Sequence, residues 1–273
     1  MKYLKLLLLG FVLTVILSGC LQVNTKVNLN RDGSGTIEET VLMKNEVIKM
    51  MKEFAVMFDS TKNEEFAMFK EEELKSKASN FGEGVKYVSG EKLTIEGYEG
   101  YKVVYAFTDI NKVKLSPSPD DKIPFGDDLN KDEEKAVDDY LKFNFSKGNP
   151  STLVINFPKP KMEDEIKPDS SFTPVEDSTF NDETQQKFIE MFDGMKIAVH
   201  FNFEDGIDET DASFVDGSEV TLMEVDFSEI IKNKDVVKNL QSTKPKTMEE
   251  FREVIGDLKG IKIEFKDPVT IKF

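Results

Sequence analysis

The residues of this chain that could do chemistry begin with a run of oxygen-bearing side chains near the N-terminus. The run is NLNRDGSGTIEE, residues 28–39, and it fits the calcium-loop template D-x-[DN]-x-[DN]-G-x5-E except at its first position, Asn28. An EF-hand loop lies between two helices, whereas here apolar and polar residues alternate on both sides, which predicts two strands joined at Asp32-Gly33. A strand from Thr36 would carry Glu39 about 10 Å from Gly35, too far to close on an ion. We therefore expect a hairpin and no metal site.

Cys20 is the second candidate, because it is the single cysteine and ends an unusual N-terminal segment. The segment MKYLKLLLLGFVLTVILSGC has two lysines, an apolar run and then small residues, which is typical of a secretory signal. Its last four residues, Leu17-Ser18-Gly19-Cys20, resemble the lipobox of bacterial lipoproteins, in which the cysteine is lipidated and becomes the mature N-terminus. We expect residues 1–19 to be a signal peptide, cleaved between Gly19 and Cys20, and Cys20 to carry acyl chains such as palmitate.

Two alternatives to this anchor fit the sequence less well. A retained transmembrane helix needs about 20 apolar residues, and the run after Lys5 is shorter. A purely structural role for Cys20 does not explain why the only cysteine stands at the lipobox position.

His200 is the third candidate, since a Ser-His-Asp or Cys-His triad would have to be built around the only histidine. In the strand pattern KIAVHFNF it falls on the face opposite Ile197 and Phe201, so we expect an ordinary strand histidine. No Gly-x-Ser-x-Gly, His-Glu-x-x-His or Gly-rich phosphate loop follows residue 20. One His and one acylated Cys also cannot supply the four nitrogen and sulfur ligands of a structural zinc site. The sequence predicts no enzyme, no catalytic residue, no metal and no cofactor.

The charge balance excludes further classes of partner. The formal net charge is −16, and it becomes −18 once the segment containing Lys2 and Lys5 is removed. Such a balance opposes binding to nucleic acid and to anionic lipid surfaces. Arg31 and Arg252 are the only arginines, so few bidentate grips for phosphate exist.

The elements that must position these residues follow from apolar periodicity. We predict a helix over residues 45–58, with Val47, Met51, Phe54 and Phe58 on one face, and this face is a possible pocket lining as well as plain core. The other predicted helices are 61–81, 183–192, 229–240 with Ser228 as cap, and 247–258. The predicted strands are 21–29, 36–43, 85–88, 92–95, 101–108, 141–145, 153–157, 197–203, 220–227, 261–265 and 269–273.

This order of elements favours an α+β fold: a mainly antiparallel, curved β-sheet built from hairpins, with several packed amphipathic helices. An acidic excursion is expected over 116–139 and a flexible loop or linker over 158–182. The second segment could divide the chain, but we expect one extracytoplasmic domain over 20–273, in which strands 197–203 and 220–227 pair with the early strands.

The start VNTKVNLNRDGSGTIEETV, directly after the lipobox, resembles bacterial LppM-type lipoprotein domains, and so does the strand-turn-strand run 196–227. Those proteins commonly carry a C-terminal transmembrane helix, whereas this chain ends in the polar strand TIKF. The resemblance implies a curved sheet with a hydrophobic cavity suited to a lipid-like ligand, and it carries no catalytic residues.

Together these observations predict a lipoprotein of the cell membrane or outer membrane, anchored through Cys20 on the extracytoplasmic side. We expect a non-enzymatic binding or interaction module, with a hydrophobic or lipid-like ligand as one hypothesis. The alternative is a structural or assembly factor of the cell envelope that acts through protein contacts, for example along an exposed C-terminal strand.

Overall fold

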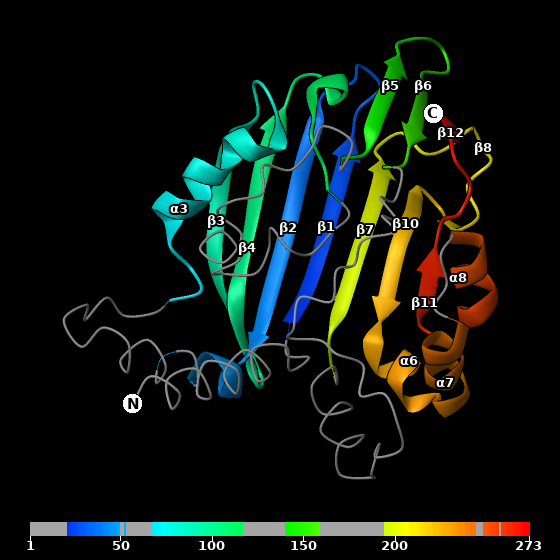
Figure 1. Cartoon of the computed structure of the whole chain (residues 1–273). Helices are drawn as coiled ribbons and strands as arrows, with labels where there is room; N and C mark the ends of the chain where they lie inside the picture. The colour runs from blue at the N-terminus through cyan, green and yellow to red at the C-terminus, as the bar shows by residue number, and fades with distance from the viewer. Residues whose placement is uncertain are drawn as a thin grey trace, which may run out of the picture.

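Two β-sheets dominate the computed structural model, which describes residues 21–49, 52, 67–116, 140–158, 194–243, 248–256 and 258–273 (Figure 1). The larger sheet has the order β11-β10-β7-β1-β2-β4-β3, and β9 pairs with β10. Its strands are β1 (Leu21–Leu29), β2 (Gly35–Lys44), β3 (Lys86–Ile95), β4 (Tyr98–Phe107), β7 (Lys196–Phe203), β9 (Val215–Asp216), β10 (Glu219–Asp226) and β11 (Ile261–Ile263). Neighbours are antiparallel except β1 and β7, which run parallel.

The smaller sheet has the order β5-β6-β12-β8 and is antiparallel throughout. It contains β5 (Lys142–Ser146), β6 (Thr152–Asn156), β8 (Glu209–Thr210) and β12 (Val269–Lys272). Because β12 lies between β6 and β8, the expectation of an exposed C-terminal strand is wrong. Phe273 is fully buried at its end.

The helices among the described residues are few and short, which corrects the prediction of several packed amphipathic helices. They are α3 (Glu71–Ser76), α6 (Phe227–Lys232), α7 (Lys234–Thr243), α8 (Met248–Ile255) and the 3-10 turns η1 (Lys77–Phe81) and η2 (Ile110–Lys112). Residues 45–49, the described start of the helix predicted over 45–58, are helical as well. The single helix predicted over 229–240 is interrupted at Asn233. Its cap is Asp226 instead of Ser228, since the Asp226 carboxylate accepts the Ser228 backbone N–H at 3.0 Å.

The core lies on one face of the larger sheet, and strand alternation decides which residues enter it. Along β1 the odd-numbered residues from Leu21 to Leu29 are all buried, while the even-numbered ones are not. Aromatic contacts join this face to the smaller sheet: the Phe203 and Phe273 ring centroids are 4.6 Å apart, and those of Phe143 and Phe201 are 5.7 Å apart. The strand pairing confirms the prediction of a mixed, strand-rich and mainly antiparallel architecture.

The hairpin predicted at residues 28–39 is confirmed. Asn28 pairs with Thr36 across the turn, and Gly33 there has a φ of 88°. Gly35 is required for a different reason, because a Cβ on it would lie 2.0 Å from the carbonyl oxygen of Asn28. Glu39 lies far along β2, opposite Thr25 on the core face, where it is 4% exposed and accepts from Thr25 Oγ1 at 3.5 Å.

Other strand predictions need smaller changes. The two strands predicted at 85–88 and 92–95 are one strand, β3, with a bulge between Tyr87 and Ser89 that keeps it paired with β4. Strand 197–203 pairs with the early strand β1, as expected, but the strand predicted at 220–227 reaches the early strands only through β7. Predictions for 50–51, 53–66, 117–139 and 159–193 lie outside the described residues.

Candidate functional site

The face of the larger sheet opposite the core carries mostly polar side chains, and we call it the polar face. A bulge between Thr221 and Met223 adds one residue to β10, so the polar positions on both sides of it stay in register with β7. The polar face comprises Gln22, Asn24, Lys26 and Asn28 of β1, Thr36, Glu38, Thr40 and Leu42 of β2, Lys196, Ala198, His200 and Asn202 of β7, and Glu219, Thr221, Glu224 and Asp226 of β10.

A ladder of neutral hydrogen bonds crosses the polar face near the β1–β2 turn. Ser218 Oγ donates to Asn202 Oδ1 at 2.9 Å, and Asn202 Nδ2 donates to Asn28 Oδ1 at 3.2 Å. Asn28 Nδ2 in turn donates to Thr36 Oγ1 at 3.2 Å. Because each amide is held on both sides, this ladder fixes the side chains of three adjacent strands in one arrangement.

A charged cluster lies one row further along the same strands. Glu219 Oε2 accepts from Lys26 Nζ at 2.8 Å, and Glu219 Oε1 lies 3.3 Å from His200 Nδ1. The same nitrogen is 3.1 Å from Thr221 Oγ1. Burial lowers the pKa of His200 below its usual value, against the opposing effect of the Glu219 and Glu224 charges. Burial at this position therefore favours the neutral form of His200.

The cluster contains a hydroxyl, a histidine and a carboxylate, but its geometry is unlike a catalytic triad. In a triad the two ring nitrogens have separate partners: one takes the proton of the nucleophile, and the other is held by the acid. Here Thr221 and Glu219 both approach Nδ1 of His200. If Nδ1 accepted the proton of the Thr221 hydroxyl, Glu219 would face that same nitrogen and would not hold the N–H on the other side of the ring, as the acid of a triad does. This arrangement favours a structural or binding role for the cluster.

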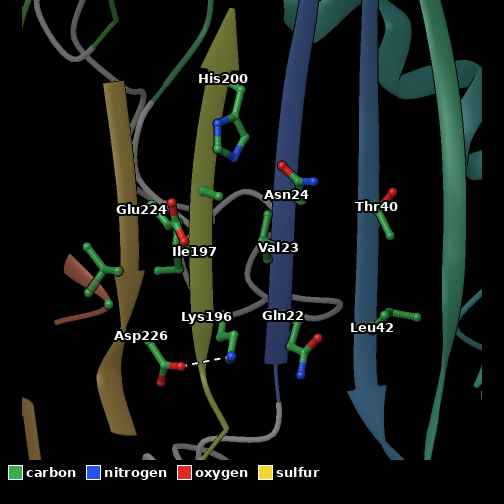
Figure 2. Close-up of a pocket in the computed structure, with 13 residues that line it drawn as sticks. Gln22, Val23, Asn24, Thr40, Leu42, Lys196, Ile197, His200, Glu224 and Asp226 are labelled. Carbon is green, nitrogen blue, oxygen red and sulfur yellow. Dashed lines mark ion pairs between the residues drawn. The ribbon is translucent and has the colours of Figure 1, made fainter. Parts of the chain in front are cut away.

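A hollow of about 380 Å³ opens on the polar face beside this cluster, and we call it the Ala198 hollow. Figure 2 shows side chains of β10, β7, β1 and β2 rising around it. The hollow is deepest at Ala198, because this small side chain lies between the longer side chains of Lys196 and His200 on the same face of β7. It is lined by Gln22, Val23, Asn24, Thr40, Leu42, Lys196, Ile197, Ala198, His200, Glu224, Val225, Asp226 and Gly260.

The charges at this hollow are paired and of both signs. Lys196 Nζ lies 2.8 Å from Asp226 Oδ2, the contact dashed in Figure 2, and Lys262 Nζ lies 2.7 Å from Glu224 Oε2. Burial by itself would raise the pKa of Asp226, but the Lys196 hydrogen bond and charge and the Ser228 N–H outweigh it and lower that pKa. The hollow therefore offers amide, hydroxyl and paired ionic groups without a strong net field.

A second hollow, of about 400 Å³, lies at the other end of the polar face beside the hydrogen-bonded ladder. Its lining is again polar with one aromatic ring: Asn28, Asn30, Ser34, Gly35, Thr36, Phe107, Asn202 and Glu204. Part of the 28–39 motif thus lines a concave surface, but through amides and hydroxyls instead of carboxylates. The described residues contain no cluster of three or more His, Cys, Asp or Glu side chains that could hold a metal ion.

The site residues predicted from the sequence lie mostly outside the part of the chain that the structure describes. Gly19, Cys20, Met51, Phe54 and Phe58 lie outside the described residues. Val47 is described, and it is buried in the core cluster. Sequence reasoning missed both hollows, although the polar half of the β1 alternation was visible. What it could not give was which strands lie beside β1.

Comparisons with known proteins add little. No family model matches the chain, and no curated protein does. Among solved structures, the chain is similar to the folded domain of LppM from Mycobacterium tuberculosis, determined by NMR, with 12% identity and a TM-score of 0.30 over 75% of this chain and 81% of that one. A likeness this weak carries no argument about function. No helix in the described ranges is long and apolar enough to cross a membrane.

Proposed function

We propose that this protein is a lipid-anchored extracytoplasmic binding module without enzymatic activity, and that the polar face is its binding surface. The observation that carries the proposal is the arrangement of this face: cross-strand hydrogen bonds hold its side chains in place around two hollows. Preformed concavities with fixed polar groups are typical of ligand sites. The single-nitrogen geometry at His200 gives no support for nucleophilic catalysis.

The anchor is supported by the sequence alone. The lipobox ending at Cys20 and the preceding signal-like segment predict acylation of that cysteine on the outer side of a membrane. Acyl chains contribute about 0.8 kcal/mol per buried CH₂, so two or three of them hold a protein at a bilayer durably.

The chemistry of the Ala198 hollow favours a ligand with polar groups. Amides at Gln22 and Asn24 and the hydroxyl of Thr40 can both donate and accept hydrogen bonds. An amphipathic ligand fits this lining better than a purely apolar one. A hydrophobic cavity under the helix predicted over residues 45–58 stays a separate prediction, because Val47 is buried in the core and Met51, Phe54 and Phe58 lie outside the described residues.

The anchor is tested by replacing Cys20 with Ala in the full chain. We expect this variant to leave the membrane fraction or to keep its signal segment, and to lose the mass of the acyl chains. Gel shift, membrane fractionation and intact mass measurement give the readout. A processed, membrane-bound Cys20→Ala protein would refute the anchor.

The binding surface is tested by filling the Ala198 hollow. Ala198→Leu adds bulk at its floor and removes no hydrogen bond, while Ala106→Leu adds the same bulk to the same face outside both linings. Native mass spectrometry of full-length protein extracted in mild detergent should show an adduct that the first variant loses and the second keeps. Equal adducts in both variants, or none in the unmodified protein, would count against the hollow.

The alternative, an assembly factor acting through protein contacts, is favoured by one feature, the outer edge of β3. Among the described strands β3 pairs only with β4, and Val88 at its bulge is 56% exposed. Free strand edges accept strands from partners. Replacing Val88 with Lys should dissociate any envelope complex seen on native gels of membranes, whereas Ala198→Leu should not.

A further inference from the structure

The end of the larger sheet at which β1 begins includes six strand termini that are neighbours in the sheet, and we call it the anchor end. In the register of the sheet these residues are neighbours, and β2 and β10 run toward this end in Figure 1. They are Leu21 of β1, Lys44 of β2, Ile95 of β3, Tyr98 of β4, Lys196 of β7 and Asp226 of β10.

The chain leaves no slack between this end and the residue proposed to carry the lipid. Leu21 is the first residue of β1 and follows Cys20 directly, so their Cα atoms are about 3.8 Å apart. A flexible linker of ten residues would instead allow a typical reach of roughly 16–19 Å. A cysteine acylated at this point can therefore stand only beside the anchor end.

The distance between Cys20 and the sheet cannot be increased by detaching the start of β1. The strand lies between β7 and β2, and its ladder starts at Gln22 on one side and Leu21 on the other. Leu21 and Val23 are buried in the core cluster. Releasing them would break hydrogen bonds to two neighbours and expose both side chains to water.

The surface of the anchor end is compatible with a bilayer. Ile95 is 52% exposed in the β3–β4 turn, one of three large apolar side chains among the described residues that are strongly exposed. The other two, Val88 and Val215, lie away from this end. Ile95 lies on β3, three strands from β1 but at the same end of the sheet, and an apolar side chain there can enter the headgroup region and add to the attachment of the acyl chains.

We infer that the anchor end of the larger sheet docks on the lipid bilayer, with the strands rising from the membrane surface. This inference rests on the proposed acylation of Cys20. The lining of the Ala198 hollow includes Gln22 and Asn24, which follow the lipid-bearing residue by two and four positions in the chain. The β1–β2 turn projects about 26 Å away from it, at ~3.3 Å per residue of β1.

The test uses depth-dependent quenching. Since the only native cysteine is acylated, a single introduced cysteine is the only thiol open to a bimane label. Full-length acylated protein is reconstituted in phosphatidylcholine vesicles that contain a headgroup-nitroxide lipid. Glu96→Cys places the label in the β3–β4 turn, Glu91→Cys further up β3, and Lys147→Cys in the exposed β5–β6 turn near Arg31.

We expect quenching several-fold stronger at position 96 than at 147, with 91 between them. Equal quenching at the three positions, or the reverse order, in vesicle-bound protein of acylated mass would overturn the docking. Protein that lacks the acyl mass and fails to sediment with vesicles would instead refute the anchor itself. Inserting ten Gly and Ser residues between Cys20 and Leu21 should keep acylation and make the quenching at the three positions more nearly equal. An unchanged ranking of the three positions in this variant would also overturn the inference.

Discussion

Lys26 and Glu219 lie 193 residues apart in sequence, and their side chains meet across the intervening strand β7, with 2.8 Å between Nζ and Oε2. His200 of β7 lies beneath this bridge, with its Nδ1 3.3 Å from the other oxygen of Glu219. The charges on β1 and β10 therefore act on one histidine from both sides. The protonation of His200 reports the geometry of the polar face.

The first prediction concerns the pKa of His200. The Glu219 charge raises this pKa and the Lys26 charge lowers it, while burial lowers it most. Glu219→Gln should move the pKa further down, and Lys26→Gln should move it up. Because His200 is the only histidine, its ring signals in an NMR titration are unambiguous.

The matched control is Lys102→Gln, which removes a lysine of the same face that pairs with Glu38 at 3.0 Å. This variant should leave the His200 titration where it is. Shifts of the same sign for the Glu219 and Lys26 variants would show that the cluster is not arranged as described.

The second prediction is a pH dependence of stability. The folded protein holds the pKa of His200 below the ordinary value of 6.5, so the unfolded chain binds a proton first as the pH falls. The free energy of unfolding should therefore decrease as the pH falls from 6.5 toward the lower folded pKa. Urea unfolding at pH 7.5 and 5.5 should show a smaller decrease for His200→Gln, and parallel changes in both proteins would contradict the assignment.

The third prediction separates two roles of Asp226, which pairs with Lys196 and caps α6. Asp226→Asn keeps an acceptor for the cap and loses the charge, which should cost less than about 1 kcal/mol for a partly exposed pair. Asp226→Ala loses the cap as well, at about 1 kcal/mol more. In the folded protein the pKa of Asp226 is lowered. The extra free energy of unfolding that Asp226 gives over the Asn variant should therefore disappear as the pH falls below 3.8 and through the folded pKa.

Denaturant unfolding of the three proteins at pH 7 gives the comparison. Equal losses in the two variants would mean that the Ser228 N–H contributes nothing through Asp226. A Lys196→Met protein serves as the control, because it removes the ion pair and leaves the cap in place.

The fourth prediction concerns Gly35, which has an ordinary φ but no room for a side chain. Gly35→Ala should cost about 3 kcal/mol, because its Cβ would overlap a backbone oxygen across the hairpin. Gly206→Ala is the contrast, since Gly206 has a φ of +88° with nothing within 4 Å, and should cost about 1–2 kcal/mol. Thermal unfolding that ranks the two variants the other way round would contradict the close approach.

The fifth prediction concerns Glu264, a buried carboxylate in the connection between β11 and β12. It accepts from Ser213 Oγ at 2.9 Å, from the backbone N–H of Ser213 and from that of Lys266 at 2.9 Å. Glu264→Ala should lose about 1–3 kcal/mol, because buried donors are left without an acceptor. Urea unfolding should place Glu264→Gln between Ala and the native residue, since its amide offers a single oxygen.

Local chemistry in the sequence was enough for the hairpins. Alternation over Leu21–Leu29 and the Asp32-Gly33 turn predicted both the strands and their register, since a slip by one residue would turn Val23 and Val27 toward water. The same alternation placed His200 on the face opposite the core. Each of these features depends on residues close together in the chain.

Helix lengths were less predictable. The run 229–240 has helical spacing, yet Asp226 captures the first free N–H and the helix ends before Asn233, whose side chain accepts the Val236 N–H as the next helix begins. Competing caps only a few residues apart decide such boundaries, and their choice depends on what each helix packs against.

By itself, then, the sequence determined the signal-like segment, the strand faces, the early turn and the small number of residues suited to catalysis. Each of these depends on residue types at short spacing. Only the tertiary structure decided that β7 lies parallel to β1, that Lys26 meets Glu219 over His200, and that a hollow opens at Ala198 beside this cluster. The physical reason is that strand periodicity fixes which way a side chain points. Which strand lies beside it is fixed by packing between segments far apart in the chain.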